Sequence, residues 1–153
     1  MNAGMTNSSA DESSNSAPKL LRIFLRFQGF WLLVAVGAVV MPAAWMDQIH
    51  QWLGLGSLPE EPIVGYLARS TSALYAIHGA VTLFVTFDLN RYRPLVGLII
   101  ALNFFVGIAI LAIDIAVGMP WWWSMSEGPG ISVFALFCGR LWLGWRPAKD
   151  EVA

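Results

Sequence analysis

Five polar side chains inside long apolar runs are the residues of this sequence best placed to do chemistry. They are Arg69, Tyr75 and His78 in one run, and Asn103 and Asp114 in the next. Spacings of three and four put Tyr75 and His78 on one helix face, and positions 103, 107, 110 and 114 also share a face. Because polar groups are costly in lipid, such residues often mark a binding site, an ion pair or a proton path.

Counting along the two runs predicts which of these residues lie at similar depth. At about 1.5 Å per residue, Arg69 lies about 9 Å and His78 about 22 Å from the outer end of their helix. By the same rise, Asp114 lies about 6 Å and Asn103 about 22 Å from the outer end of theirs. We therefore expect Arg69 to face Asp114 and His78 to face Asn103. Two interpretations stay open, a pair that fixes helix register and a binding or proton-relay site.

No catalytic, cofactor-binding or metal-binding residue stands out. A metal site usually takes three or four ligands, whereas His50 lies in a loop far from His78 in the sequence and Cys138 is the single cysteine. A haem with His78 as its one axial ligand is disfavoured. A glycine-flanked serine elbow is missing as well. The sequence therefore predicts no cofactor, and it favours a protein that is not an enzyme.

Four apolar runs must position these side chains. The chain is 57% hydrophobic and 12% charged, where a soluble domain carries about 25% charged residues. A helix crosses a bilayer with about 20 apolar residues. We expect an all-α polytopic membrane protein with four transmembrane helices in an up-down bundle. The runs are Leu20–Met41, Ile63–Phe87, Leu95–Gly118 and Ile131–Trp145.

The runs divide the chain into three regions. Residues 1–18 are rich in Ser and Asn and lack apolar periodicity, which predicts a disordered cytoplasmic leader. Residues 19–146 form the transmembrane domain, and 147–153 form a cytoplasmic tail. The first run is long for a signal peptide, so we interpret it as an uncleaved anchor.

The charges next to the runs predict the orientation. Lys and Arg lie at the start of run one, between runs two and three and at the end of run four, whereas the other two loops contain neither. Positive charge stays cytoplasmic, so both termini are expected inside, in a multi-pass protein of the cell inner membrane. The basic residues behind this expectation are Lys19, Arg22, Arg26, Arg91, Arg93, Arg140, Arg146 and Lys149.

The two outer loops contain further structure. Apolar side chains between Trp45 and Leu55 recur at helical spacing, which predicts an amphipathic helix along the membrane interface. Trp121–Trp123 form an aromatic belt element, and residues 126–130 are expected to make a tight turn. Ala38–Pro42 and Ala116–Pro120 are similar, which suggests a repeated hairpin.

A family resemblance rests on residues 45–50 (WMDQIH), 68–79 (ARSTSALYAIHG) and 91–94 (RYRP). These segments are similar to those of an uncharacterised family of small bacterial four-helix inner-membrane proteins, and the layout resembles, more distantly, the DoxX-like group. The resemblance implies a bacterial inner membrane and carries no catalytic motif.

Two classes of function remain at this point. One is a non-enzymatic accessory or scaffold subunit. The alternative is binding or transport of a quinone, lipid or proton-coupled substrate at a polar site between the second and third helices. The expected partners are the lipid bilayer and another membrane protein or a second copy of the chain, and no nucleic acid is expected.

Overall fold

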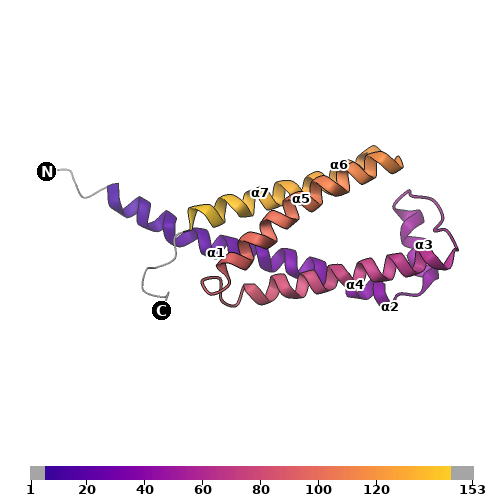
Figure 1. The fold of residues 1–153 in the computed structure, drawn as a ribbon, viewed down its shortest axis with the longest axis horizontal. Coiled ribbons are helices and arrows are strands. Elements are labelled where there is room, and N and C mark those ends of the chain that lie inside the picture. Colours follow the sequence, from indigo (N-terminus) through magenta and orange to yellow (C-terminus); the bar gives the residue numbers. More distant parts are fainter. Residues whose placement is uncertain (1–5, 146–153) are drawn as a thin grey trace. The chain divides into compact units, whose positions relative to one another are not determined.

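The computed structural model describes residues 6–145, with side chains described from residue 17 onward, and all of its regular structure is helical (Figure 1). The all-α prediction is thus confirmed for this part of the chain. The predicted tail begins beyond the described residues. The helices are α1 (Thr6–Leu33), α2 (Val36–Val40), α3 (Ala43–Trp52), α4 (Pro62–Val85), α5 (Arg93–Val117), α6 (Trp121–Ser126) and α7 (Gly128–Gly144).

Two helical segments among the described residues are long and apolar enough to cross a membrane. They are Ala17–Val40, which combines most of α1 with α2, and Arg93–Val117, which is α5. α4 and α7 correspond to the other two predicted runs, and α7 has 17 residues.

The chain forms two compact units. The central unit is Phe27–Phe84, and the terminal unit consists of the residues up to Arg26 together with those from Val85 onward. α1 passes from the terminal unit into the central unit. α1 begins at Thr6, within the predicted leader of residues 1–18, and the disorder of that leader stays a prediction. Adding residues to an existing helix, such as the one formed by residues 19–33, costs less free energy than nucleating a new helix.

A contact between two glycines joins the helices of the central unit. A Cβ at Gly79 of α4 would stand 2.6 Å from the carbonyl oxygen of Gly29 and 2.6 Å from the nitrogen of Leu33, both in α1. Both glycines are buried. The missing side chains therefore let the two backbones touch, the arrangement that small residues provide between helices in membranes.

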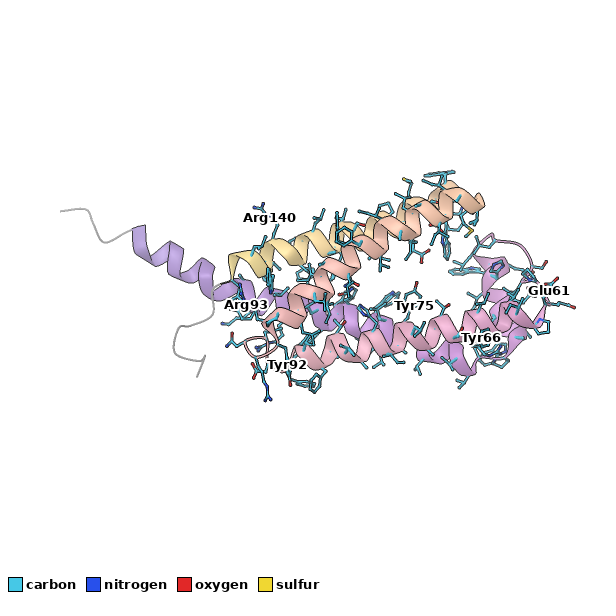
Figure 2. The ribbon with its side chains drawn as sticks, viewed as in Figure 1. Glu61, Tyr66, Tyr75, Tyr92, Arg93 and Arg140 are labelled. Atoms are coloured by element: carbon cyan, nitrogen blue, oxygen red, sulfur yellow. The ribbon has the colours of Figure 1, made fainter. Side chains whose placement is uncertain are left out.

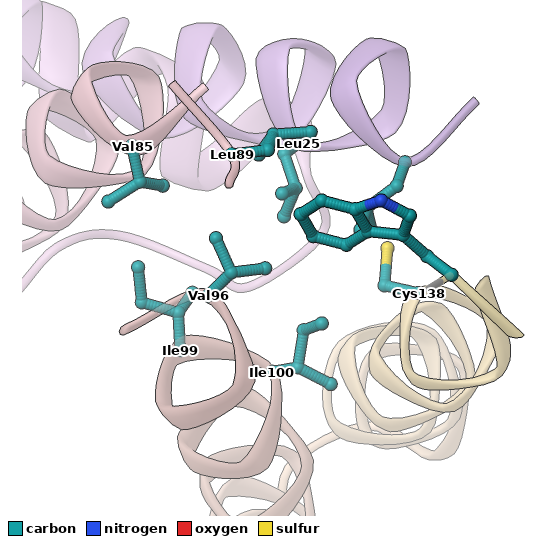
Figure 3. Packing of buried hydrophobic residues seen from close by; sticks show 9 residues of the cluster. Leu25, Val85, Leu89, Val96, Ile99, Ile100 and Cys138 are labelled. Atoms are coloured by element: carbon teal, nitrogen blue, oxygen red, sulfur yellow. The ribbon is translucent and has the colours of Figure 1, made fainter. Parts of the chain in front are cut away.

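Aliphatic side chains from α1, α5 and the α4–α5 connection form the core of the terminal unit. Figure 3 shows Leu25, Val96 and Ile100 in this cluster, together with Cys138 of α7. Phe24 adds an edge-on ring contact with Phe137, with centroids 4.8 Å apart. The remaining members of the buried cluster are Leu21, Val85, Leu89, Ile99 and Trp145.

A second glycine contact joins α5 to α7. A Cβ at Gly128 would stand 2.6 Å from the carbonyl oxygen of Gly107 and 2.8 Å from the nitrogen of Leu111. Gly107 stands thirteen residues before Pro120, as Gly29 does before Pro42. Both prolines are N-caps, of α6 and α3 respectively. The Met-Pro similarity in the sequence thus coincides with matching backbone contacts inside the two units.

The predicted tight turn at residues 126–130 is wrong. The amide of Glu127 donates to Trp123 O and the amide of Ile131 donates to Glu127 O, so helical hydrogen bonding continues from α6 into α7. Pro129 has no N–H and belongs to the first turn of α7, where proline is well tolerated. The Gly-Pro-Gly sequence therefore makes a helix start, with a break at Glu127 between α6 and α7.

Candidate functional site

The five predicted site residues fall in both units. Arg69, Tyr75 and His78 lie on α4 in the central unit, and Asn103 and Asp114 lie on α5 in the terminal unit. Each predicted pair, Arg69 with Asp114 and His78 with Asn103, joins a residue of one unit to a residue of the other. Both pairs stay predictions.

In the central unit, Arg69 has a backbone partner that the sequence did not indicate. Its Nη2 donates a hydrogen bond of 2.9 Å to the carbonyl oxygen of Met41, the C-cap residue of α2. The carbonyls at a helix C-terminus carry partial negative charge and attract cations. The guanidinium therefore ties α4 to the end of α2. Tyr75 and His78 lie further along α4, both partly buried (Figure 2 labels Tyr75).

In the terminal unit, both predicted residues of α5 are buried. Asn103 is 8% exposed and Asp114 is 6% exposed. The Oδ2 atom of Asp114 is enclosed and has no hydrogen-bond partner among the described residues. A buried carboxylate oxygen without a hydrogen-bond partner is costly, because it has lost its contacts with water.

Glu127 lies within electrostatic range of Asp114, a proximity that the sequence did not indicate. Gly128 lies against Leu111, one helical turn before Asp114, and this contact brings the preceding residue beside α5. Burial raises the pKa of Glu127, a hydrogen bond from the Trp123 side chain lowers it, and the negative charge of Asp114 raises it. Glu127 therefore lies near the C-terminal part of α5, where the negative charge of Asp114 acts on its carboxyl group.

Basic and aromatic residues gather at the opposite end of the α5–α7 pair. The guanidinium carbon of Arg93 lies 4.7 Å from the ring centroid of Trp142 and 5.5 Å from that of Trp145. Trp142 Nε1 donates to Arg93 O at 3.2 Å, and Arg93 Nη2 donates to Trp145 O at 3.3 Å. Figure 2 shows Arg93 and Arg140 at this end. Arg93, one of the basic residues predicted to be cytoplasmic, thus lies beside two tryptophans within this unit.

The amphipathic helix predicted in the first outer loop is α3. Asp47 accepts a 2.7 Å hydrogen bond from the Leu58 amide and a 2.8 Å bond from Gln51 Nε2, and His50 Nδ1 bonds Gly56 O at 2.9 Å. The polar face of α3 thus holds the following loop. The exposed face carries an open groove of about 350 Å³, lined by Trp45, Gln48, Ile49 and Trp52.

The described residues contain no group of three or more His, Cys, Asp or Glu side chains that could hold a metal ion. Comparisons with family models, with curated proteins and with solved structures find no match to this chain. The site must therefore be interpreted from its own geometry.

Proposed function

We propose that this chain is a four-helix integral membrane protein with a non-enzymatic role, as an accessory or scaffold subunit. The observation that supports this proposal most strongly is that large apolar side chains are exposed on every long helix. Examples are Trp31 of α1 at 69%, Phe84 of α4 at 53%, Phe105 of α5 at 65% and Leu136 of α7 at 55% exposure.

This distribution suits lipid far better than water. A soluble monomer rarely exposes apolar patches beyond a few hundred Å², because each exposed Å² costs about 25 cal/mol. Lipid chains cover such a surface without that cost, and helices in lipid associate instead through small residues and hydrogen bonds. Gly29 with Gly79, and Gly107 with Gly128, supply the small-residue contacts.

The proposed spans are α1 with α2, α4, α5 and α7, with α3 and α6 at the outer interface. Lys19, Arg22 and Arg26 near the start of the first span, Arg91 and Arg93 before the third, and Arg140 near the end of the fourth favour a cytoplasmic N- and C-terminus. The bacterial inner membrane is the proposed location, in line with the resemblance noted above. Lipid and a second membrane protein or another copy of the chain are the proposed partners.

Reporter fusions and alkaline washing test the membrane assignment. The protein should remain in alkali-washed membranes, a fusion after Ser57 should report the outer side, and a fusion after Arg91 should report the cytoplasm. Release into the wash, or an outer signal at Arg91, would contradict the proposal.

The scaffold role rests on how the polar side chains are used. Arg69 donates to Met41 O and Ser132 donates to Phe104 O at 3.3 Å, so both connect neighbouring helical segments through backbone carbonyls. Polar groups used in this way hold the bundle together, which is the structural interpretation of the sequence pattern.

The alternative, a small-molecule site, is favoured by one observation in the central unit. Gln28 Oε1 and Thr82 Oγ1 are buried without a hydrogen-bond partner among the described residues, and Thr82 is one helical turn from His78. A polar ligand group could satisfy such atoms.

A complementation experiment separates the two roles. A deletion strain would receive the wild-type gene or conservative variants, namely Tyr75→Phe, His78→Gln and Thr82→Val, with equal membrane levels verified by immunoblot. A scaffold role predicts that every variant restores the deletion phenotype. Failure of well-folded His78→Gln and Thr82→Val proteins would favour the ligand site instead.

A further inference from the structure

Positive charge is concentrated in the terminal unit, around its aliphatic core. Residues 19–26, 85–96 and 138–145 all contribute to that buried cluster. These three segments contain six basic side chains and a single acidic one, Asp88. This part of the unit therefore carries an excess of positive charge. The basic residues are Lys19, Arg22, Arg26, Arg91, Arg93 and Arg140.

The Arg93 guanidinium is fixed in place by tryptophans. It lies over the rings of Trp142 and Trp145 and donates to Trp145 O, while its Nε is enclosed and lacks a hydrogen-bond acceptor among the described residues. Aromatic rings and a carbonyl attract a cation, but they do not neutralise its charge. Trp145 also packs in the same buried cluster as Leu25, so Arg93 stands close to α1.

The basic residues of α1 share one face of that helix. Lys19, Arg22 and Arg26 recur at intervals of three and four, and all three are exposed. Arg26 Nε donates a 3.1 Å hydrogen bond to Thr86 Oγ1, which holds this face beside the connection between α4 and α5. In that connection, Asp88 accepts a 3.0 Å hydrogen bond from the amide of Arg91.

The choice of arginine points to phosphate as the partner of this charge. Five of the six basic residues are Arg. Lysine would serve equally well to orient the chain in a membrane, whereas the planar guanidinium matches the oxygens of a phosphate with two parallel hydrogen bonds. At the other end of the α5–α7 pair, residues 119–130 contain Glu127 and no Lys or Arg. The preference for anions is therefore confined to one end of the pair.

We propose that Arg22, Arg26, Arg91 and Arg93 form a basic surface that binds the phosphate groups of anionic phospholipids in the inner leaflet. Arg22, Arg26 and Arg91 are exposed and contact the phosphates, and Arg93 adds its fixed charge. The tryptophans beside Arg93 suit this position, because Trp concentrates at the level of the headgroups. The inference rests on the proposed membrane function and deepens it, because it names the class of lipid that the chain selects.

Native mass spectrometry of the full chain in a neutral detergent tests the basic surface. Phosphatidylglycerol and phosphatidylcholine with identical acyl chains would be titrated separately, and phosphatidylglycerol should bind on the order of tenfold more tightly. Arg22→Gln should weaken phosphatidylglycerol binding about fivefold, the usual effect of one basic residue near an anionic surface, and should leave phosphatidylcholine binding unchanged.

Arg140→Gln is the matched control. It also removes one exposed arginine from the terminal unit, but Arg140 lies on the side of α7 away from α5 (Figure 2). This change should weaken phosphatidylglycerol binding less than about twofold. Arg91→Gln, at a second exposed position of the basic surface, should act like Arg22→Gln and keeps the test decisive if one variant folds poorly by circular dichroism.

Three results would overturn the proposal. These are equal affinity for the two lipids, equal losses from Arg22→Gln and Arg140→Gln, and competition by soluble glycerol phosphate as strong as that by the lipid, which would indicate a free anion. Flotation with vesicles of phosphatidylcholine alone separates this inference from the proposed function. A chain that floats but shows no preference for phosphatidylglycerol contradicts the basic surface only, whereas a chain that does not float contradicts the membrane assignment as well.

Discussion

Gly79 packs directly on the backbone of Gly29, so closely that a Cβ at position 79 would stand 2.6 Å from the Gly29 carbonyl oxygen. Real Cβ atoms do not approach the backbone this closely. To make room for a side chain, α1 and α4 would have to move apart and lose the contact between Gly29 and Gly79. The two helices of the central unit are therefore joined at a point where only glycine fits.

We expect Gly79→Ala to lower the free energy of unfolding by about 1–3 kcal/mol, the usual cost of overpacking a close contact. Gly37→Ala is the matched control, because a Cβ there meets nothing within 4 Å. That change should be neutral or stabilise by up to about 1 kcal/mol, since Ala is the better helix former. Thermal unfolding in detergent measures both. Equal stability of the two variants would show that the helices are not tightly packed at Gly79.

The Arg93–Trp142 interaction gives a second prediction. Trp142→Phe keeps an aromatic ring but removes the Nε1–H that bonds Arg93 O, and should cost about 1 kcal/mol of stability. Trp121→Phe is the control, since Trp121 is mostly exposed and should change stability by less than about 0.5 kcal/mol. Unfolding followed by circular dichroism compares them. A larger loss from the control would argue against the interaction.

The loop after α3 should depend on pH through Asp47. The Leu58 amide, followed by Gln51, holds the pKa of Asp47 below its ordinary value of 3.8. A lowered folded pKa means that the ionised carboxylate stabilises the loop above pH 3.8, and that this contribution is lost as the pH falls through the lower folded value. The Leu58 amide shift in NMR spectra should titrate there. Asp47→Asn should abolish the titration, whereas Glu60→Gln should leave it intact.

The two faces of α3 should differ in their contact with lipid. Spin labels at Ile49, in the groove, and at Gln51, on the face that bonds Asp47, would be compared in vesicles for collision with oxygen and with a water-soluble nickel chelate. Ile49 should favour oxygen, which concentrates in lipid, and Gln51 the chelate. Equal accessibility would contradict the interfacial position.

The sequence by itself determined the helical elements and their chemistry. Long apolar runs, a Met-Pro pair at two helix ends and the spacing of Trp45, Ile49 and Trp52 are local patterns, readable because a helix repeats every 3.6 residues. The burial of Asn103 and Asp114 likewise agrees with their predicted common face. The Gly-Pro-Gly segment was predicted wrongly, because the same residues suit both a turn and the first turn of a helix.

Only the tertiary structure decided which groups meet. The bond from Arg69 to Met41 O joins residues 28 apart, and the position of Glu127 beside α5 depends on the contact between Gly107 and Gly128. Such contacts follow from where two helices cross, and that point is set by the absence of a few side chains. Periodicity along one helix shows which face is polar, but it contains no information about the backbone that this face meets.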